Sequence, residues 1–230
     1  MNKKEILTEL PPNEVKGFSR RNFLGLTGGL LAAGALLNAS CNNDDDSNPM
    51  PGVTLTNDDF GILNYAYALE QLEAAFYSRV VETGFYDGAT ASEKALLTDI
   101  RDHEIAHREF FKAALGAKAI GSLGVNFSTI DFKNRTSVLG TAKVFEDLGV
   151  SAYNGAGVYI QSTDYLLLAG KIVSVEARHA AYIRDLISNG TFASGDAQID
   201  MNGMDISKKP SVVLAAASAF ITTKINSNLP

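Results

Sequence analysis

Two glutamate and histidine pairs with the same spacing occur in this sequence of 230 residues. Glu104 is followed three residues later by His107, and Glu176 is followed three residues later by His179. A helix turns about 100° per residue, so the two members of each pair lie on one helix face. Carboxylate oxygens and imidazole nitrogens bind divalent metals, and a set without sulfur suits iron or manganese better than structural zinc. The pairs therefore suggest a metal centre.

Two further glutamates precede these pairs at similar distances along the chain. Glu70 is followed seven residues later by Tyr77, which lies about two helical turns along the same face. Glu146 has the same relation to Tyr153. One Glu-x-x-His pair is a weak signal, but here each pair follows a Glu-x6-Tyr segment. The chain thus repeats a helix pair that carries Glu, Tyr, Glu and His in this order.

These side chains lie on apolar faces. Leu97 and Phe111, for example, lie within about 40° of Glu104 around the helix axis. Ionised carboxylates in such positions are costly without partners, and four together repel one another. Two divalent cations would balance their charge. We therefore predict a buried centre of two iron (or manganese) ions with the following ligands: Glu70, Glu104, His107, Glu146, Glu176 and His179.

The first helix offers two candidate ligands, because Glu73 also lies on its inner face. We favour Glu70 for its spacing to Tyr77, and we keep Glu73 as an alternative ligand or as a residue that supports the ligands from outside. Tyr77 and Tyr153 either donate hydrogen bonds near the metals or simply pack in the core.

Four helices must bring these residues together. The apolar period and the start and stop signals predict helices over about 56–82, with Thr56 as N-cap, and over 90–115, with a capping box at its start. A third helix is expected from residue 136 or 137 to about 153, where Asn154, Gly155 and Gly157 break it. A fourth follows residues 162–164 and ends before 188–190.

The remaining segments complete the predicted fold. An apolar run after Pro210 is expected to form a further helix packed against the bundle, and two long connections cover about 116–135 and 189–209. A link as long as the first can cross a helical bundle. The predicted fold class is therefore all-α, a four-helix bundle with a long crossover between helices 2 and 3 and an extra C-terminal helix.

The composition narrows the function further. A hydrophobic content of 46% suits one sizeable core, and the net charge of -6 argues against nucleic acid as a partner. The single cysteine, Cys41, excludes an intramolecular disulfide and a thiolate metal site.

The N-terminal segment "SRRNFLGLTGGLLAAGALLNASC" looks like a twin-arginine signal peptide, with Arg20 and Arg21 before an apolar stretch. This stretch is shorter than the roughly 20 residues of a membrane-spanning helix. The small residues before Cys41 resemble a lipoprotein cleavage site, after which Cys41 would carry the lipid; the alternative is a soluble cleavage that leaves a free thiol. We expect a signal peptide over 1–40, a flexible tether over 41–55 and a helical domain over 56–230. The protein would be anchored in the bacterial cell envelope, or periplasmic without the lipid.

The chain resembles the ferritin-like superfamily, and more narrowly the secreted bacterial ferritin-like domain family that includes plant desiccation-related proteins. The similarity covers about 57–188 and is carried by "LNYAYALEQLEAAFY", "HEIAHREFFKAAL", "FEDLGVSAYNGAG" and "VEARHAAYIRDLI". It implies the same six ligands and a di-iron (or manganese) centre that reacts with dioxygen or peroxide. Many members have an acidic residue just before the glutamate of helix 2 or 4, where this chain has His103 and Val175. The usual acidic residue that orients a ligand histidine is then missing, or another residue takes this role. We expect His103 to lie at the rim or in the core.

The leading hypothesis is a redox protein of the cell envelope that oxidises ferrous iron or consumes peroxide. Its partners would be metal ions, dioxygen or peroxide, and the membrane through a lipid at Cys41, with no nucleic acid; a homodimer is left open. The alternative is a non-enzymatic stress-related scaffold or binding module. In that case the carboxylates would be protonated, hydrogen-bonded internally, or paired with Arg178 or Arg108. An oxygenase acting on an organic substrate stays open as a third hypothesis.

Overall fold

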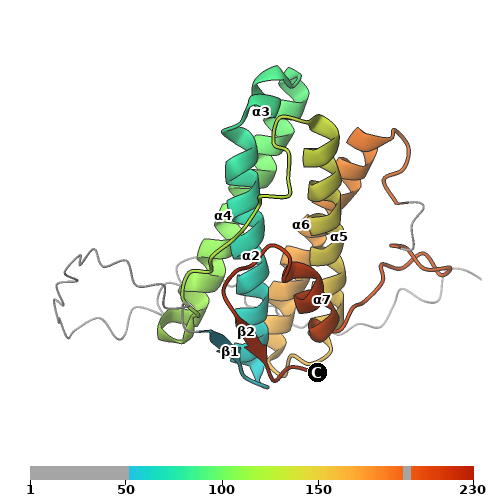
Figure 1. The fold of residues 1–230 in the computed structure, drawn as a ribbon. Coiled ribbons are helices and arrows are strands. Elements are labelled where there is room, and N and C mark those ends of the chain that lie inside the picture. Colours follow the sequence, from blue (N-terminus) through green and yellow to red (C-terminus); the bar gives the residue numbers. More distant parts are fainter. Residues whose placement is uncertain (1–51, 194–197) are drawn as a thin grey trace, which may run out of the picture. The chain divides into compact units, whose positions relative to one another are not determined.

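Four long helices form a bundle in the computed structural model of this chain (Figure 1), which describes residues 52–193 and 198–230. All described residues belong to the unit Asn48–Pro230. The long helices are α2 (Asp59–Val81), α4 (Ala91–Leu115), α5 (Arg135–Gly157) and α6 (Thr163–Ile187). The short elements are β1 (Val53–Leu55), α3 (Gly84–Gly88), the 3-10 turn η2 (Gly116–Lys118), α7 (Pro210–Ala217) and β2 (Ile225–Ser227). The predicted all-α fold class is confirmed.

Side-chain caps define where the long helices begin. The Asp58 side chain accepts a hydrogen bond at the start of α2, and Asn134 does the same for α5. Thr90 and Glu93 form the predicted capping box of α4, while Ser162 caps α6. Such caps satisfy backbone N–H groups that have no partner within the helix.

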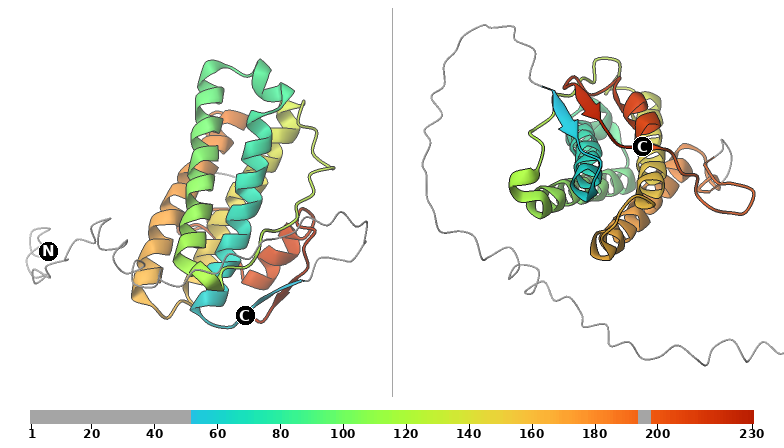
Figure 2. Two further views of the ribbon diagram at one scale, coloured as in Figure 1. Left: turned by 90° about the vertical axis from the view of Figure 1, so that its left-hand side faces the viewer. Right: turned by 90° about the horizontal axis from the view of Figure 1, so that it is seen from below.

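The bundle consists of two antiparallel helix pairs, α2 with α4 and α5 with α6 (Figure 2). The connection from α4 to α5 runs along the outside of the bundle to the opposite end, which is the predicted crossover (Figure 1). Arg135 marks the end that it reaches, because this side chain binds Glu93 at the start of α4 and the carbonyl oxygen of Leu186 at the end of α6. Helices α4 and α5 therefore run in the same direction.

Two buried amide side chains of α2 hold the crossover in place. The backbone N–H of Ile120 donates to Asn64 Oδ1, and that of Leu123 donates to Gln71 Oε1. Asn64 Nδ2 also donates to the carbonyl oxygen of Lys118. A connection without regular structure thus satisfies part of its backbone hydrogen bonding on one helix.

The C-terminal segment returns to the start of the domain. Strand β2 pairs in parallel with β1, and Ile221 forms an isolated antiparallel bridge with Val125 of the crossover. The tether expected to reach residue 55 therefore ends earlier, because residues 53–55 are the strand β1. Residues 41–51 of that tether and the proposed signal peptide, including Arg20, Arg21 and Cys41, lie outside the described residues. None of the helices in the described part is long and apolar enough to cross a membrane.

Several predicted boundaries were wrong. The N-cap of the first helix is Asp58 rather than Thr56, whose hydroxyl instead donates to Asp58 Oδ1. The short helix α3 was not predicted. The run after Pro210 is helical only as far as Ala217, since Thr222 donates its backbone N–H to the crossover at Gly124. Helix α5 begins at Arg135, one or two residues before the expected start. It continues through Gly155 to Gly157 instead of ending near residue 153.

Candidate metal centre

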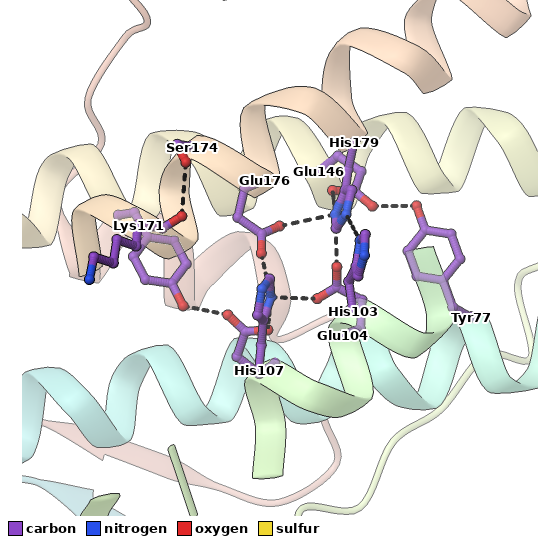
Figure 3. Close-up of polar contacts among 11 residues, drawn as sticks. Tyr77, His103, Glu104, His107, Glu146, Lys171, Ser174, Glu176 and His179 are labelled. Atoms are coloured by element: carbon purple, nitrogen blue, oxygen red, sulfur yellow. Dashed lines mark hydrogen bonds and ion pairs between the residues drawn. The ribbon is translucent and has the colours of Figure 1, made fainter. Parts of the chain in front are cut away.

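Each of the four long helices contributes to one buried cluster in the interior of the bundle (Figure 3). Helices α2 and α5 each provide one glutamate, and α4 and α6 each provide a Glu-x-x-His pair. The glutamate side chains are almost fully buried, while His107 is 13% exposed and is the most accessible member. The structure thus brings together all six predicted ligands: Glu70, Glu104, His107, Glu146, Glu176 and His179.

The cluster consists of two overlapping groups that could each hold a metal ion. The first group contains Glu70 and His107, and the second contains Glu146 and His179. Glu104 and Glu176 belong to both groups. In each group the potential ligand atoms lie within 4.8 Å of one another. Two neighbouring ions that share two carboxylates would fit this arrangement.

The two groups have almost the same geometry, as the internal repeat leads us to expect. His107 Nδ1 lies 2.9 Å from Glu176 Oε1, and His179 Nδ1 lies 2.9 Å from Glu104 Oε1. Each histidine lies 3.8 Å from the glutamate of its own helix. The distances to Glu70 and Glu146 are 3.4 Å and 3.5 Å. Each shared glutamate therefore directs one oxygen toward each histidine.

The atoms that face the centre of the cluster contact one another and have no hydrogen-bond partner outside the cluster among the described residues. Each group contains three such carboxylate oxygens and one imidazole nitrogen. Glu104 and Glu176 each contribute one oxygen to each group. Buried polar atoms are normally paired, and leaving one unpaired costs about 1 to 3 kcal/mol. Oxygen and nitrogen atoms at these positions fit the ligand set of divalent iron or manganese. The chemistry and arrangement of the residues thus fit two metal ions.

Two tyrosines hold the glutamates that belong to only one group. Tyr77 of α2 donates a hydrogen bond to Glu146 Oε1 of α5, and Tyr153 of α5 donates one to Glu70 Oε1 of α2. The pairing is thus exchanged between the helices, since neither tyrosine binds the glutamate that precedes it by seven residues. Each glutamate keeps its other oxygen, Oε2, directed toward the cluster.

A fifth carboxylate, that of Glu73, is buried beside the cluster but belongs to neither group. Its position in α2 corresponds to Gly149 in α5, since each follows a predicted ligand by three residues. A Cβ atom at Gly149 would lie 3.2 Å from Glu73 Oε1 and 3.7 Å from Glu176 Oε2. Gly149 therefore leaves the space that Glu73 occupies. Of the two candidates in the first helix, Glu70 is the one that lies in a group.

His103 contacts the cluster from outside. Its Nδ1 atom lies 2.9 Å from His179 Nε2, the nitrogen that faces away from the glutamates (Figure 3). His103 was expected at the rim or in the core, and it is exposed at the rim. The contact with His179 was not predicted. The contact joins α4 to α6, and the two residues are 76 positions apart.

The titratable side chains of the cluster differ in the direction in which their pKa values are shifted. Burial raises the pKa of Glu104 well above its usual value, and repulsion by Glu176 adds to this shift. Burial also acts to raise the pKa of Glu176, but its contacts with His107 and His179 outweigh it and lower the pKa to about 2. Burial alone would lower the pKa of His107, whereas its contacts with three glutamates raise it to about 12. Burial likewise acts to lower the pKa of His179, whereas its contacts with Glu104, Glu146 and Glu176 raise the pKa well above its usual value.

Apolar packing isolates the cluster along the bundle axis. On one side Phe76 packs against both Tyr77 and Phe145, and on the other Tyr153 packs with Phe111. Apolar surroundings of this kind strengthen electrostatic interactions. Any ion held here would interact mainly with the protein's own oxygen and nitrogen atoms.

The fold and the cluster define a class of protein, an all-α bundle in which carboxylates and imidazoles converge between four helices. The sequence model of a family described as a ferritin-like domain matches residues 58–189 of the chain. This protein belongs to that ferritin-like domain family. The comparison with curated proteins gave no match.

Proposed function

We propose that this protein binds two iron or manganese ions and uses them in redox reactions with dioxygen or peroxide, oxidising ferrous iron or consuming peroxide. The observation that carries the proposal is the division of the unpaired buried atoms into two groups that share Glu104 and Glu176. With four ionised glutamates, two divalent ions would make the cluster electrically neutral. When bound, redox-active ions held by these residues would supply electrons to the oxidant.

The chain's own residues would perform three tasks. Glu104 and Glu176 would bind both ions and keep them adjacent. Tyr77 and Tyr153 hold one oxygen of Glu146 and Glu70 and so fix the direction of the other oxygen. The apolar packing on both sides keeps bulk water away.

The first test is ion binding together with proton release. We expect the purified metal-free protein to take up about two ferrous or manganous ions per chain under anaerobic conditions. Contacts with the glutamates raise the pKa of both His107 and His179 in the metal-free protein, so each ion must displace a proton from its histidine. We expect at least two protons to be released at pH 7. Binding should therefore weaken as the pH falls. Elemental analysis measures the number of bound ions, and a pH indicator dye measures the number of released protons. Air or peroxide is then added to the iron-loaded protein, and oxidation is followed by absorbance.

A matched pair of variants on α4 controls this test. Glu104→Gln removes a charge that both groups share, and we expect it to abolish tight binding and oxidation. Glu109→Gln changes an exposed glutamate that pairs with Arg108, and we expect wild-type behaviour. Uptake of less than about one ion by the wild type, or equal uptake by Glu104→Gln, would overturn the proposal.

A scaffold without functional metal is the competing function, and negative results in these tests would favour it. In such a protein the carboxylates could be stabilised by protonation, since burial raises the pKa of Glu104. The other expected feature of a scaffold, pairing of the buried carboxylates with Arg108 or Arg178, is not found in the part of the chain that the structure describes. Arg108 binds Glu109 instead, and Arg178 is exposed.

We also propose that the protein is exported by the twin-arginine route and anchored in the cell envelope by a lipid on Cys41, as a member of the secreted branch of the family. The support is the sequence alone, namely Arg20, Arg21, the apolar stretch and the small residues before Cys41. We expect a labelled fatty acid to be incorporated into the wild type but not into Cys41→Ser when each is expressed in the native host. Equal labelling of both would contradict the anchor.

A further inference from the structure

We propose that the two ion positions are unequal and that His103 is the positioning residue that makes the position at His179 the tighter one. This inference rests on the proposed metal binding. It concerns a side chain outside the six ligands and a difference that the internal repeat does not predict.

The near symmetry of the cluster makes the difference easy to locate. The contacts of His107 and His179 with the surrounding glutamates agree to within 0.1 Å between the two groups. The repeat breaks one residue before each shared glutamate, where α4 has His103 and α6 has Val175. A valine side chain has no atom that can form a hydrogen bond.

His103 determines which nitrogen of His179 is available to an ion. The Nδ1 atom of His179 faces Glu104, Glu146 and Glu176, and its Nε2 atom faces His103. An ion binds the lone pair of Nδ1, so the proton of the neutral imidazole must be on Nε2. His103 Nδ1 then accepts the hydrogen bond from this Nε2–H group, and its own proton is on Nε2. With His103 as the acceptor, the contact stabilises the tautomer of His179 that binds an ion.

The same contact orients and covers the ring of His179. The two imidazole planes are inclined by only 11°, with their centroids 5.2 Å apart. The side chain of His179 is 6% exposed, compared with 13% for His107. Within residues 52–193 and 198–230, the Nε2 atom of His107 has no corresponding hydrogen-bond partner.

These differences predict that an ion bound by His179 is released more slowly than one bound by His107. Partners that orient a ligand histidine typically contribute 10- to 100-fold to metal affinity. His103 fixes the tautomer of His179 and also covers its ring, so it should slow the dissociation of the ion that His179 binds. The two ions should therefore leave the protein in two separate phases.

The experiment loads the metal-free protein anaerobically with cobalt(II), whose visible absorption reports its ligands, and then adds excess chelator. We expect the wild type to lose one cobalt equivalent quickly and the other about 10 to 100 times more slowly. His103→Ala should accelerate the slow phase by a similar factor and leave the fast phase unchanged. His103→Asn places an acceptor oxygen near the position of Nδ1, and it should restore most of the slow phase.

Two controls make the result specific. Val175→Ala changes the matching position on α6 and should leave both phases as in the wild type. Because His103 is exposed, the metal-free variants should unfold at nearly the same temperature as the wild type. A single phase in the wild type, an unchanged slow phase in His103→Ala, or release from His103→Asn as fast as from His103→Ala would overturn the inference. Failure of the wild type to bind cobalt would instead contradict the proposed function.

Discussion

Replacing Glu176 by glutamine is expected to weaken both ion positions at once, whereas replacing Glu70 by glutamine should weaken only one. Glu176 directs Oε1 toward His107 and Oε2 toward His179, so its two oxygens serve different groups. Glu70 directs only Oε2 toward the cluster, because its Oε1 accepts a hydrogen bond from Tyr153. The structure thus separates shared from unshared carboxylates although all are glutamates on similar helix faces.

The physical reason is that a glutamine side chain has one acceptor oxygen and one NH2 group. At position 176 the NH2 group would point toward one of the two ions whichever way the amide turned, and one negative charge would be lost between them. At position 70 the NH2 group can turn toward Tyr153 and the oxygen toward the ion. We expect Glu176→Gln to lose at least 100-fold in affinity for both equivalents, on the order of 3 kcal/mol each.

Calorimetric titration of the metal-free proteins with manganese(II) measures this difference. Glu70→Gln should keep one equivalent at nearly wild-type affinity, and Glu146→Gln should keep the other. Retention of one tight equivalent by Glu176→Gln would show that this carboxylate is not shared. The shared arrangement would then have to be abandoned.

A second large effect is expected from Gly155→Ala in α5. A Cβ atom at this position would lie 1.8 Å from the carbonyl oxygen of Lys208, far closer than atoms can approach without a shift. The backbone N–H of Lys208 donates to the carbonyl oxygen of Ser151, so the connection before α7 is attached to α5 at this point. Adding a methyl group should detach this connection and lower the free energy of unfolding by about 2 to 4 kcal/mol.

The control is Gly140→Ala in the same helix, where a Cβ atom would have no neighbour within 4 Å. Alanine is the better helix former, so this change should raise the free energy of unfolding by about 0.5 to 1 kcal/mol. Denaturant unfolding of the metal-free proteins, followed by circular dichroism, measures both changes. Equal stability of the two variants would contradict the close approach at Gly155.

Local sequence was sufficient for the existence of the four long helices and for the residues that meet in the cluster. The apolar period and the start signals at Thr90 and at residues 162–164 predicted α4 and α6 close to their observed bounds. Caps and periods depend on residues within a turn or two, so a single sequence contains them. The six candidate ligands could be predicted to meet in the interior for the same reason, since each lies on an apolar face where an unpaired charge would be costly.

Some local signals were misread because distant residues change their meaning. Gly155 looked like the end of a helix, but it is the residue that allows the Lys208 backbone to approach α5. The residues after Ala217 looked like more helix, but Gly124 of the crossover binds Thr222 and Thr223. In both cases the partner lies about 50 to 100 positions away in the chain and cannot be found from periodicity.

The sequence by itself determined which residues face the interior, and thus which carboxylates and imidazoles meet there. Only the tertiary structure decided how they meet: the exchanged tyrosine pairs, the division of Glu104 and Glu176 between two groups, and the contact between His103 and His179. The physical reason is that a helix face is set by neighbours along the chain. A hydrogen bond between helices instead requires their separation, rotation and axial shift, which depend on the packing of the whole bundle.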